Sequence, residues 1–274
     1  MRKKKFIIRL LQNIIAWMLT IVIILPFLIV LLNSFKSQGE AYLMDFSLPE
    51  KFLFENYATV IERGHLLKGF LNSFSYALLS TVLLIVVCLL AAYVIARAGR
   101  RSCRMLYYLL IAGIALPVNN ITLMKVMSTF GLLNTRTGII ILYAALGIPT
   151  SFFIAHGFVC GIPRELDEAA VIDGCGAFSL FGRIIFPLMK PVVATLFVLN
   201  FMGTWNDFTM AVYYLNGSDK MPMTLAVYNF FGQYTQSWNL VCADIILTVL
   251  PVLVVYILGQ KYIVSGMTSG AVKG

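Results

Sequence analysis

The sequence predicts an all-α integral membrane protein with six transmembrane helices. Hydrophobic residues make up 60% of the 274 residues and charged residues only 12%, whereas soluble domains are nearer to half apolar and a quarter charged. Six apolar runs reach the length of about 20 residues that crosses a hydrocarbon core. These runs lack the alternation of barrel strands, and lipid permits only helices or closed barrels.

The first run, at 10–33, follows a basic N-terminus, as in a signal peptide. It is longer than a signal h-region and no small-residue cleavage site follows it, so we expect an uncleaved span. The other expected spans are 72–96, 105–126, 137–160, 188–215 and 240–262. Together they predict one helical domain over 1–274, in which Pro26, Pro117 and Pro251 mark structural kinks rather than gates.

The distribution of lysine and arginine predicts the orientation. Fourteen of these residues fall on one side: Arg2, Lys3, Lys4, Lys5, Arg9, Arg97, Arg100, Arg101, Arg104, Arg164, Arg183, Lys190, Lys261 and Lys273. The other side has seven: Lys36, Lys51, Arg63, Lys68, Lys125, Arg136 and Lys220. We therefore expect both termini in the cytoplasm, with multiple passes through a bacterial cytoplasmic membrane.

The densest acidic cluster lies at 163–187, in the predicted cytoplasmic connection between the fourth and fifth spans. Pro163 suits the first position of a helix, and Glu165, Asp167 and Glu168 would then lie where the helix dipole favours carboxylates. A helix over these residues would form the first arm of a hairpin.

Two glycines and two prolines predict how this connection continues. Gly174 and Gly176 can end the first helix and turn the chain. A second short helix would place three apolar residues on one face: Phe178, Phe181 and Ile185. Pro187 and Pro191 would open the fifth span. A hairpin of this length is more than a connection needs. A solvated loop is the plain alternative, but the mixture of charge and large apolar side chains favours docking on a soluble partner.

The spacing within this segment resembles the cytoplasmic EAA loop of ABC importer permeases. Glu168-Ala169-Ala170, three residues, Gly174, nine residues, then Ile184 and Pro187 carry the likeness. Further similar pieces are Asn56-Tyr57, Asn72-Ser73, GLLNT at 131–135, TWNDF at 204–208 and the C-terminal QKYIVSGMTSGAVKG. Over nearly the whole chain, the sequence resembles carbohydrate-uptake permeases of the maltose-transporter type, specifically the shorter six-helix subunit.

This resemblance implies a type I ABC importer permease and its partners. These are a second related permease, two ATP-hydrolysing subunits, an extracytoplasmic sugar-binding protein and the sugar itself. The residues that it assigns to ATPase coupling are Glu165, Glu168, Ala169, Ala170, Asp173, Gly174, Phe178, Phe181 and Pro187. The chain lacks a GxxxxGK[ST] loop, so we expect no bound cofactor, with ATP and Mg used by the partner subunits. Two histidines and five unpaired cysteines predict no metal site, and dispersed basic residues predict no nucleic-acid partner.

Several polar and aromatic residues are candidates for a translocation path. They are Asn119, Asn120, Asn200, Trp205, Asn206, Asp207 and Tyr213. Asp207 is an ionisable residue within a span, which by default indicates function, although an interfacial position beside Trp205 is the alternative. Positions 200, 203, 207, 210 and 214 would share one face of an unbroken helix.

Other classes of protein fit less well. An ABC permease for a non-sugar solute shares the hairpin pattern and stays open as the alternative. A secondary carrier usually shows paired broken helices or midplane charges in two halves, and neither is visible. An intramembrane enzyme needs a nucleophile with a base, or grouped acids or metal ligands. Asp207 and Asp244 are not joined by such groups, so we expect a transporter subunit and not an enzyme.

Overall fold

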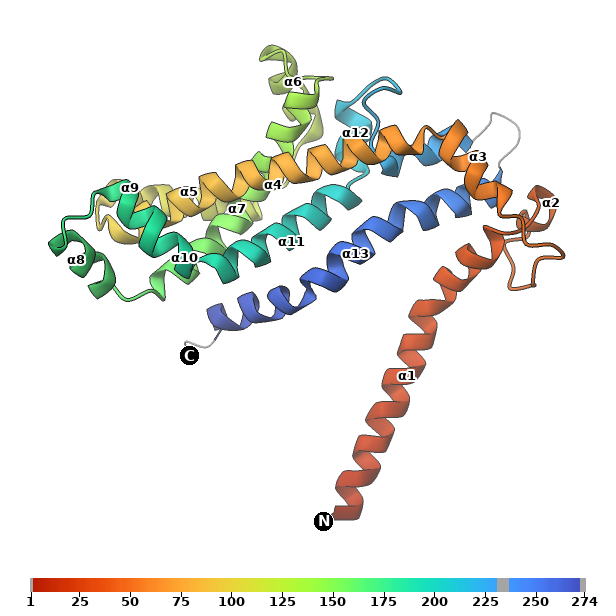
Figure 1. Ribbon diagram of the computed structural model, residues 1–274, viewed down its shortest axis with the longest axis horizontal. Coiled ribbons are helices and arrows are strands. Elements are labelled where there is room, and N and C mark those ends of the chain that lie inside the picture. The colour runs from red at the N-terminus through yellow and green to blue at the C-terminus, as the bar shows by residue number, and fades with distance from the viewer. Residues whose placement is uncertain (1, 231–236, 272–274) are drawn as a thin grey trace. The chain divides into compact units, whose positions relative to one another are not determined.

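The computed structural model describes residues 2–230 and 237–271, and side chains from 9 to 261 within that range (Figure 1). Its elements are helices: α1 (Arg2–Asn33), α2 (Gln38–Ala41), α3 (Glu55–Arg63), α4 (Leu66–Arg97), α5 (Arg101–Ala115), α6 (Asn120–Thr129), α7 (Arg136–Cys160), α8 (Glu165–Ile172), α9 (Ala177–Leu180), the π-helix Phe181–Ile185, α10 (Phe186–Leu188), α11 (Lys190–Asn206), α12 (Thr209–Tyr214), the 3₁₀ helix Met223–Phe230 and α13 (Trp238–Ala271). Strands are absent from the described part of the chain, which confirms the all-α prediction.

Within the residues that the structure describes, four helices are long and apolar enough to cross a membrane. They are Arg9–Asn33, Leu66–Arg97, Arg136–Cys160 and Trp238–Lys261. Their positions agree with four of the expected spans. A fifth candidate is the pair Ala177–Leu188 and Lys190–Asn206, which are bent by 73° relative to each other. The expected fifth span at 188–215 is therefore shorter than predicted, because α11 ends at Asn206.

The expected continuous span at 105–126 is wrong, because two separate helices occupy this part of the chain. α5 ends at Ala115, and Leu116 has extended backbone angles (φ −82°, ψ 122°). Pro117 explains the break: its ring disfavours a helical conformation at the preceding residue, and it has no N–H to donate. Asn119 then caps α6 by accepting the Thr122 N–H at 3.0 Å.

The chain divides into two compact units, residues 1–69 with 226–250 and residues 70–225 with 251–274. In the first unit, the Asn56 side chain donates to the carbonyls of Ser34 and Lys36, both at 2.9 Å, and accepts from Asn239 at 3.0 Å. The Lys36 side chain is fully buried, with Nζ 2.5 Å from Asp45 Oδ1. Hydrogen bonding by the Lys36 ammonium lowers the pKa of Asp45 to about 2. These bonds order the segment between α1 and α3.

The main core of the second unit lies between α4, α7 and α11. Leu84 and Cys88 from α4, Phe152 from α7 and Leu196 from α11 are buried in one cluster. Gly147 on α7 allows α11 to approach closely, because a Cβ there would meet Asn200 Oδ1 at 2.7 Å. The same core extends to the segment after α7, which carries the acidic cluster.

Candidate functional site

The acidic cluster forms the first turn of a short helix, as predicted. Glu165, Asp167 and Glu168 lie in the first turn of α8, where carboxylates face the positive end of the helix dipole. The predicted place of Pro163 is wrong by two residues, because α8 begins at Glu165 and its N-cap is Arg164. The Arg164 carbonyl accepts the N–H groups of Asp167 and Glu168 at 2.9 and 3.1 Å.

A glycine-dependent turn ends α8. The Gly174 N–H donates to Val171 O at 3.0 Å, and the Cys175 N–H donates to Ala170 O at 2.9 Å, which is the hydrogen-bond pattern of a Schellman motif. Gly174 has a φ of +79°, a region that glycine adopts without the steric cost of a Cβ. Apart from Gly174 itself and its chain neighbours, no described residue comes within 4 Å of a Cβ built at this position. The requirement for glycine therefore comes from the backbone conformation and not from crowding.

The second arm of the hairpin differs from the predicted helix. α9 has only four residues and continues as a π-helix before α10, and a π-helix shifts the angular position of every later residue. Phe178, which precedes the π-helix, is 93% exposed, whereas Leu180 and Ile185 are buried and Phe181 is half-buried. The expectation that Phe178 shares a face with Phe181 and Ile185 is wrong.

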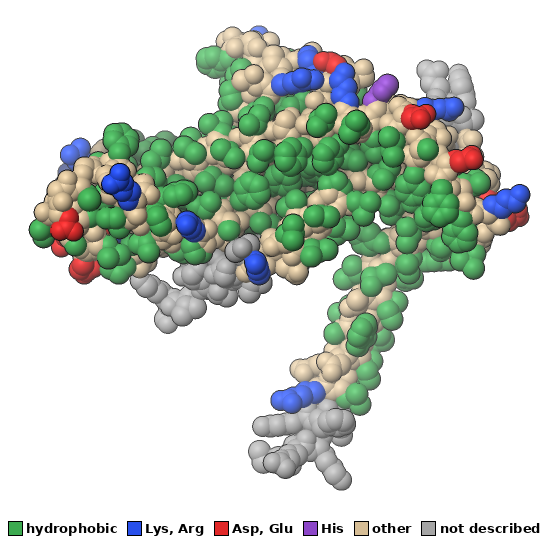
Figure 2. Space-filling view, viewed as in Figure 1, with side chains coloured by type: hydrophobic (Ala, Val, Ile, Leu, Met, Phe, Trp, Pro, Cys, Tyr) green, Lys and Arg blue, Asp and Glu red, His purple; other side chains and the backbone are tan. Residues whose placement is uncertain are grey.

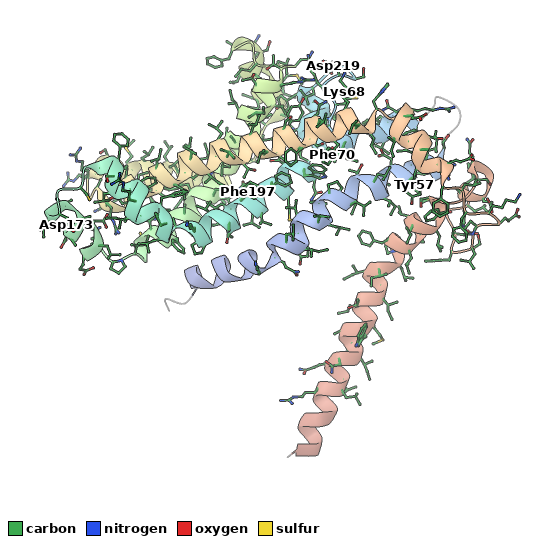
Figure 3. The ribbon with its side chains drawn as sticks, in the orientation of Figure 1. Tyr57, Lys68, Phe70, Asp173, Phe197 and Asp219 are labelled. Atoms are coloured by element: carbon green, nitrogen blue, oxygen red, sulfur yellow. The ribbon has the colours of Figure 1, made fainter. Side chains whose placement is uncertain are left out.

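The exposed side of the hairpin combines acids with large apolar side chains. We call it the docking face and define it as Glu165, Glu168, Val171, Ile172, Asp173 and Phe178. Ile172 is 84% exposed, and all three carboxylates are exposed. Asp173 lies at the far end of the hairpin in Figure 3, and acidic side chains gather at the same end in the space-filling view of Figure 2. Among the other coupling candidates, Ala169 and Pro187 are exposed while Ala170 is buried.

Asp167 has a role that the sequence did not reveal. It points away from the docking face toward the C-terminal end of α4, where its Oδ2 forms an ion pair with Arg97 at 2.7 Å. Its Oδ1 accepts a hydrogen bond from the Tyr93 hydroxyl at 2.7 Å. Arg97 also donates to Ile162 O, and Arg164 donates to Ala96 O, both at 3.1 Å. These contacts attach the base of the hairpin to α4.

Asp207 interrupts the fifth expected span and organises the break. The backbone leaves the helix at Asp207 (φ −70°, ψ 130°). Its Oδ2 accepts the Tyr143 hydroxyl at 2.8 Å and the N–H groups of Met210 and Ala211 at 2.9 and 3.3 Å. Asp207 thus satisfies the free N–H groups at the start of α12. Since α11 and α12 are separate, the expectation of one continuous face from 200 to 214 is wrong.

The other candidates for the translocation path lie in different surroundings, some in the core and some exposed. Trp205 is 2% exposed and stacks on Phe201, so it belongs to the core and not to an interfacial belt. Asn200 donates to Ser151 Oγ at 2.9 Å and links α11 to α7. The Asn120 carbonyl accepts the Tyr214 hydroxyl at 3.0 Å, which joins α6 to α12. The exposed candidates are Asn119, Asn206 and Tyr213.

We expect Asp207→Ala to destabilise the protein by about 1–2 kcal/mol, because one cap and the hydroxyl of the half-buried Tyr143 lose their acceptor. Asp207→Asn keeps one acceptor oxygen and should lose less. Thermal unfolding of the purified protein measures the difference. Equal unfolding midpoints for the wild type and Asp207→Ala would contradict the capping role and favour a function in the solute path.

Two other sequence pieces hold a loop at 216–223. Asn72 donates to the carbonyls of Asp219 and Met221 at 3.1 and 3.0 Å, and Ser73 Oγ accepts the Met223 N–H at 2.8 Å. Asn134, with a φ of +57°, accepts Lys220 Nζ at its carbonyl at 2.8 Å. Sequence reasoning singled out these motifs only by resemblance, and the structure shows that their side chains order the loop. The C-terminal piece extends beyond residue 261 and lies largely outside the described side chains.

The helices of membrane-crossing length define a multi-pass membrane protein. The exposed acidic hairpin gives it a surface suited to contact with another subunit. The model of the family "Binding-protein-dependent transport system inner membrane component" matches residues 85–269. The chain belongs to this family, which consists of transporter subunits and not of enzymes.

Similar proteins agree with this family. The probable starch degradation products transport system permease protein AmyC of Thermoanaerobacterium thermosulfurigenes is 32% identical over 99% of both chains. The diacetylchitobiose uptake system permease protein NgcG of Streptomyces coelicolor is 35% identical over 94% of this chain and 86% of its own. A crystal structure of a bacterial ABC transporter involved in alginate import contains a chain with the same fold, with a TM-score of 0.83, 20% identity and coverage of 93% and 96%.

Proposed function

We propose that this chain is a membrane-spanning subunit of an ATP-driven importer of oligosaccharides or related carbohydrates. The observation that carries the proposal is the docking face, where exposed carboxylates and Phe178 stand on a buried base of Ala170, Leu180 and Ile185. Large apolar side chains exposed beside charges are typical of a protein interface. The names of similar permeases, which refer to starch degradation products and diacetylchitobiose, support a carbohydrate as the solute.

In this proposal, ATP hydrolysis takes place in two separate subunits, and this chain binds no nucleotide. The docking face is the surface through which this chain contacts the ATPase. A second related permease completes the path, and an extracytoplasmic binding protein delivers the solute. The attachment of the hairpin to α4 through Asp167 and Arg97 supports a mechanical role, because movement of the hairpin is then transmitted to a long apolar helix.

Uptake measurements test the solute class. Cells that lack only this chain, and the same cells complemented with it, would be given labelled monosaccharides, oligosaccharides, amino acids and polyols. We expect complementation to restore uptake of one group of carbohydrates. Restored uptake of an amino acid or a polyol, with no carbohydrate transported, would support the non-sugar alternative.

We further propose that the hairpin and both termini lie in the cytoplasm, from the unequal distribution of basic residues. Gly39 and Gly176 offer matched positions for labelling, because both are exposed and a Cβ at either meets open space. In a background without native cysteines, Gly39→Cys should react with an impermeant thiol reagent on intact cells. Gly176→Cys should react only after the membrane is opened. The reverse pattern would overturn the orientation.

A further inference from the structure

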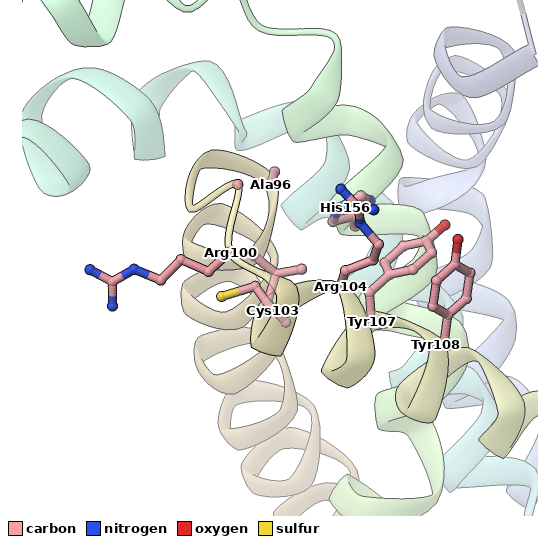
Figure 4. A pocket seen from close by; sticks show the side chains of 9 residues that line it. Ala96, Arg100, Cys103, Arg104, Tyr107, Tyr108 and His156 are labelled. Atoms are coloured by element: carbon pink, nitrogen blue, oxygen red, sulfur yellow. The ribbon is translucent and has the colours of Figure 1, made fainter.

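A cavity of about 240 Å³ lies between the end of α4, the start of α5 and α7, within the second unit. Its polar wall consists of Arg100, Cys103, Arg104, Tyr107, Tyr108 and His156. Figure 4 shows Arg104 extending toward His156, with the hydroxyls of Tyr107 and Tyr108 on the same side, while Arg100 extends in the opposite direction. The lining thus gathers hydrogen-bond donors, among them the permanently cationic guanidinium group of Arg104.

The positive charge of this cavity has no counterpart within the described protein. Neither the Arg100 nor the Arg104 side chain has a hydrogen-bond or ion-pair partner among the described residues. Asp167, the carboxylate that contacts the end of α4, is already engaged by Arg97 and Tyr93. The general excess of arginine in cytoplasmic loops accounts for arginines on this side of the membrane. It does not account for their position at the wall of a cavity.

The start of α5 also carries positive charge without a nearby negative group. No acidic residue lies in its first turn, and its N-cap, Arg100, provides no side-chain acceptor for the free N–H groups. Arginines at a helix N-terminus are unfavourable because they face the positive end of the helix dipole. A bound anion there would be stabilised by the arginines and by the dipole. The local electrostatics therefore favour an anion that the chain itself does not supply.

We propose that this cavity binds the phosphate of an anionic phospholipid headgroup. Guanidinium groups bind phosphate through paired hydrogen bonds, and tyrosine hydroxyls supply further donors. The volume is below the ~300–1,000 Å³ of sites that enclose a whole small molecule, which suits a headgroup whose tails remain outside. Met105 and Leu109, exposed on α5 by 73% and 65%, provide an apolar surface beside the cavity for those tails. Basic pockets between membrane helices are known to bind such headgroups.

The test uses the complete transporter, purified in detergent with its partner subunits. Dioleoyl phosphatidylglycerol, dioleoyl phosphatidylcholine or glycerol 3-phosphate is added, and the unfolding midpoint and the lipid retained in native mass spectrometry are measured. We expect phosphatidylglycerol, but not phosphatidylcholine, to raise the midpoint and remain bound. Arg104→Gln should weaken the apparent affinity about tenfold, as for loss of one charge-assisted contact.

Arg101→Gln is the matched control, because Arg101 is exposed on the same turn of α5 and carries the same charge but does not line the cavity. It should bind phosphatidylglycerol as the wild type does. Equal losses in Arg101→Gln and Arg104→Gln, or no effect of phosphatidylglycerol, would overturn the proposal. An Arg104-dependent response to glycerol 3-phosphate as large as that to the lipid would support phosphate recognition and assign the ligand to a soluble compound.

Discussion

Gly174→Val is expected to yield a membrane-inserted permease that no longer retains its ATPase subunits or couples ATP hydrolysis to uptake. The φ of +79° at Gly174 lies in the left-handed region, where an L-residue costs about 1–2 kcal/mol and a β-branched one is a genuine outlier. Relief of this strain would move Asp173 and Cys175 and reorient α8 relative to α9. The docking face, whose residues come from both arms, would then be divided.

Gly174→Asn provides the control, because asparagine tolerates the left-handed conformation better than other residues with a side chain. Its side chain would meet open space at this position. The measurements are co-purification of the ATPase and hydrolysis stimulated by the binding protein in reconstituted complexes. We expect Gly174→Asn to retain most of both. Normal coupling in Gly174→Val would show that the hairpin is only a connection between two spans.

The sequence predicted the first arm of the hairpin to within two residues, because local chemistry determines where that helix begins and ends. Carboxylates favour the first turn of a helix, and a glycine in the left-handed conformation ends it, so the positions of Glu165 and Gly174 required no knowledge of the rest of the fold. The second arm was predicted less well. The π-helix at Phe181–Ile185 depends on how Leu180 and Ile185 pack into the core, and a simple helical period cannot include that effect.

The breaks at Pro117 and Asp207 show a second limit of sequence patterns. Hydropathy alone treated both segments as continuous spans, because the residues around the breaks are apolar. Pro117 is the local signal of the first break, since a proline disfavours a helical conformation at the residue before it. At Asp207 the carboxylate that caps α12 also accepts a hydrogen bond from a distant partner, the Tyr143 hydroxyl on α7, and only the tertiary structure reveals that partner. The pairing of Asp167 with Arg97 was invisible for the same reason, since 70 positions separate them along the chain.

That pairing leads to the second large expected effect. Asp167→Asn should leave the docking face able to bind the ATPase, because the side chain of Asp167 points toward α4 and not into that face. The amount of solute taken up for each ATP hydrolysed should nevertheless fall several-fold. The reason is that the amide loses the ion pair with Arg97, and the hairpin can then move without displacing α4. Asp219→Asn is the matched control: it makes the same chemical change at an exposed carboxylate in the 216–223 loop.

A double-mutant cycle separates attachment from docking. Arg97 contacts both Asp167 and the Ile162 carbonyl, so Arg97→Gln should uncouple transport to a similar degree. Because the ion pair is the contact that the two side chains share, removing both partners should cost less than the sum of the single losses, with a coupling free energy of about 1–2 kcal/mol. The contact is an ion pair with imperfect hydrogen-bond alignment at Asp167 Oδ2, which keeps this value modest. Additive losses in the double variant would show that Asp167 and Arg97 act independently, and the hairpin would then have to transmit its motion through the buried contacts of Ala170, Leu180 and Ile185 instead.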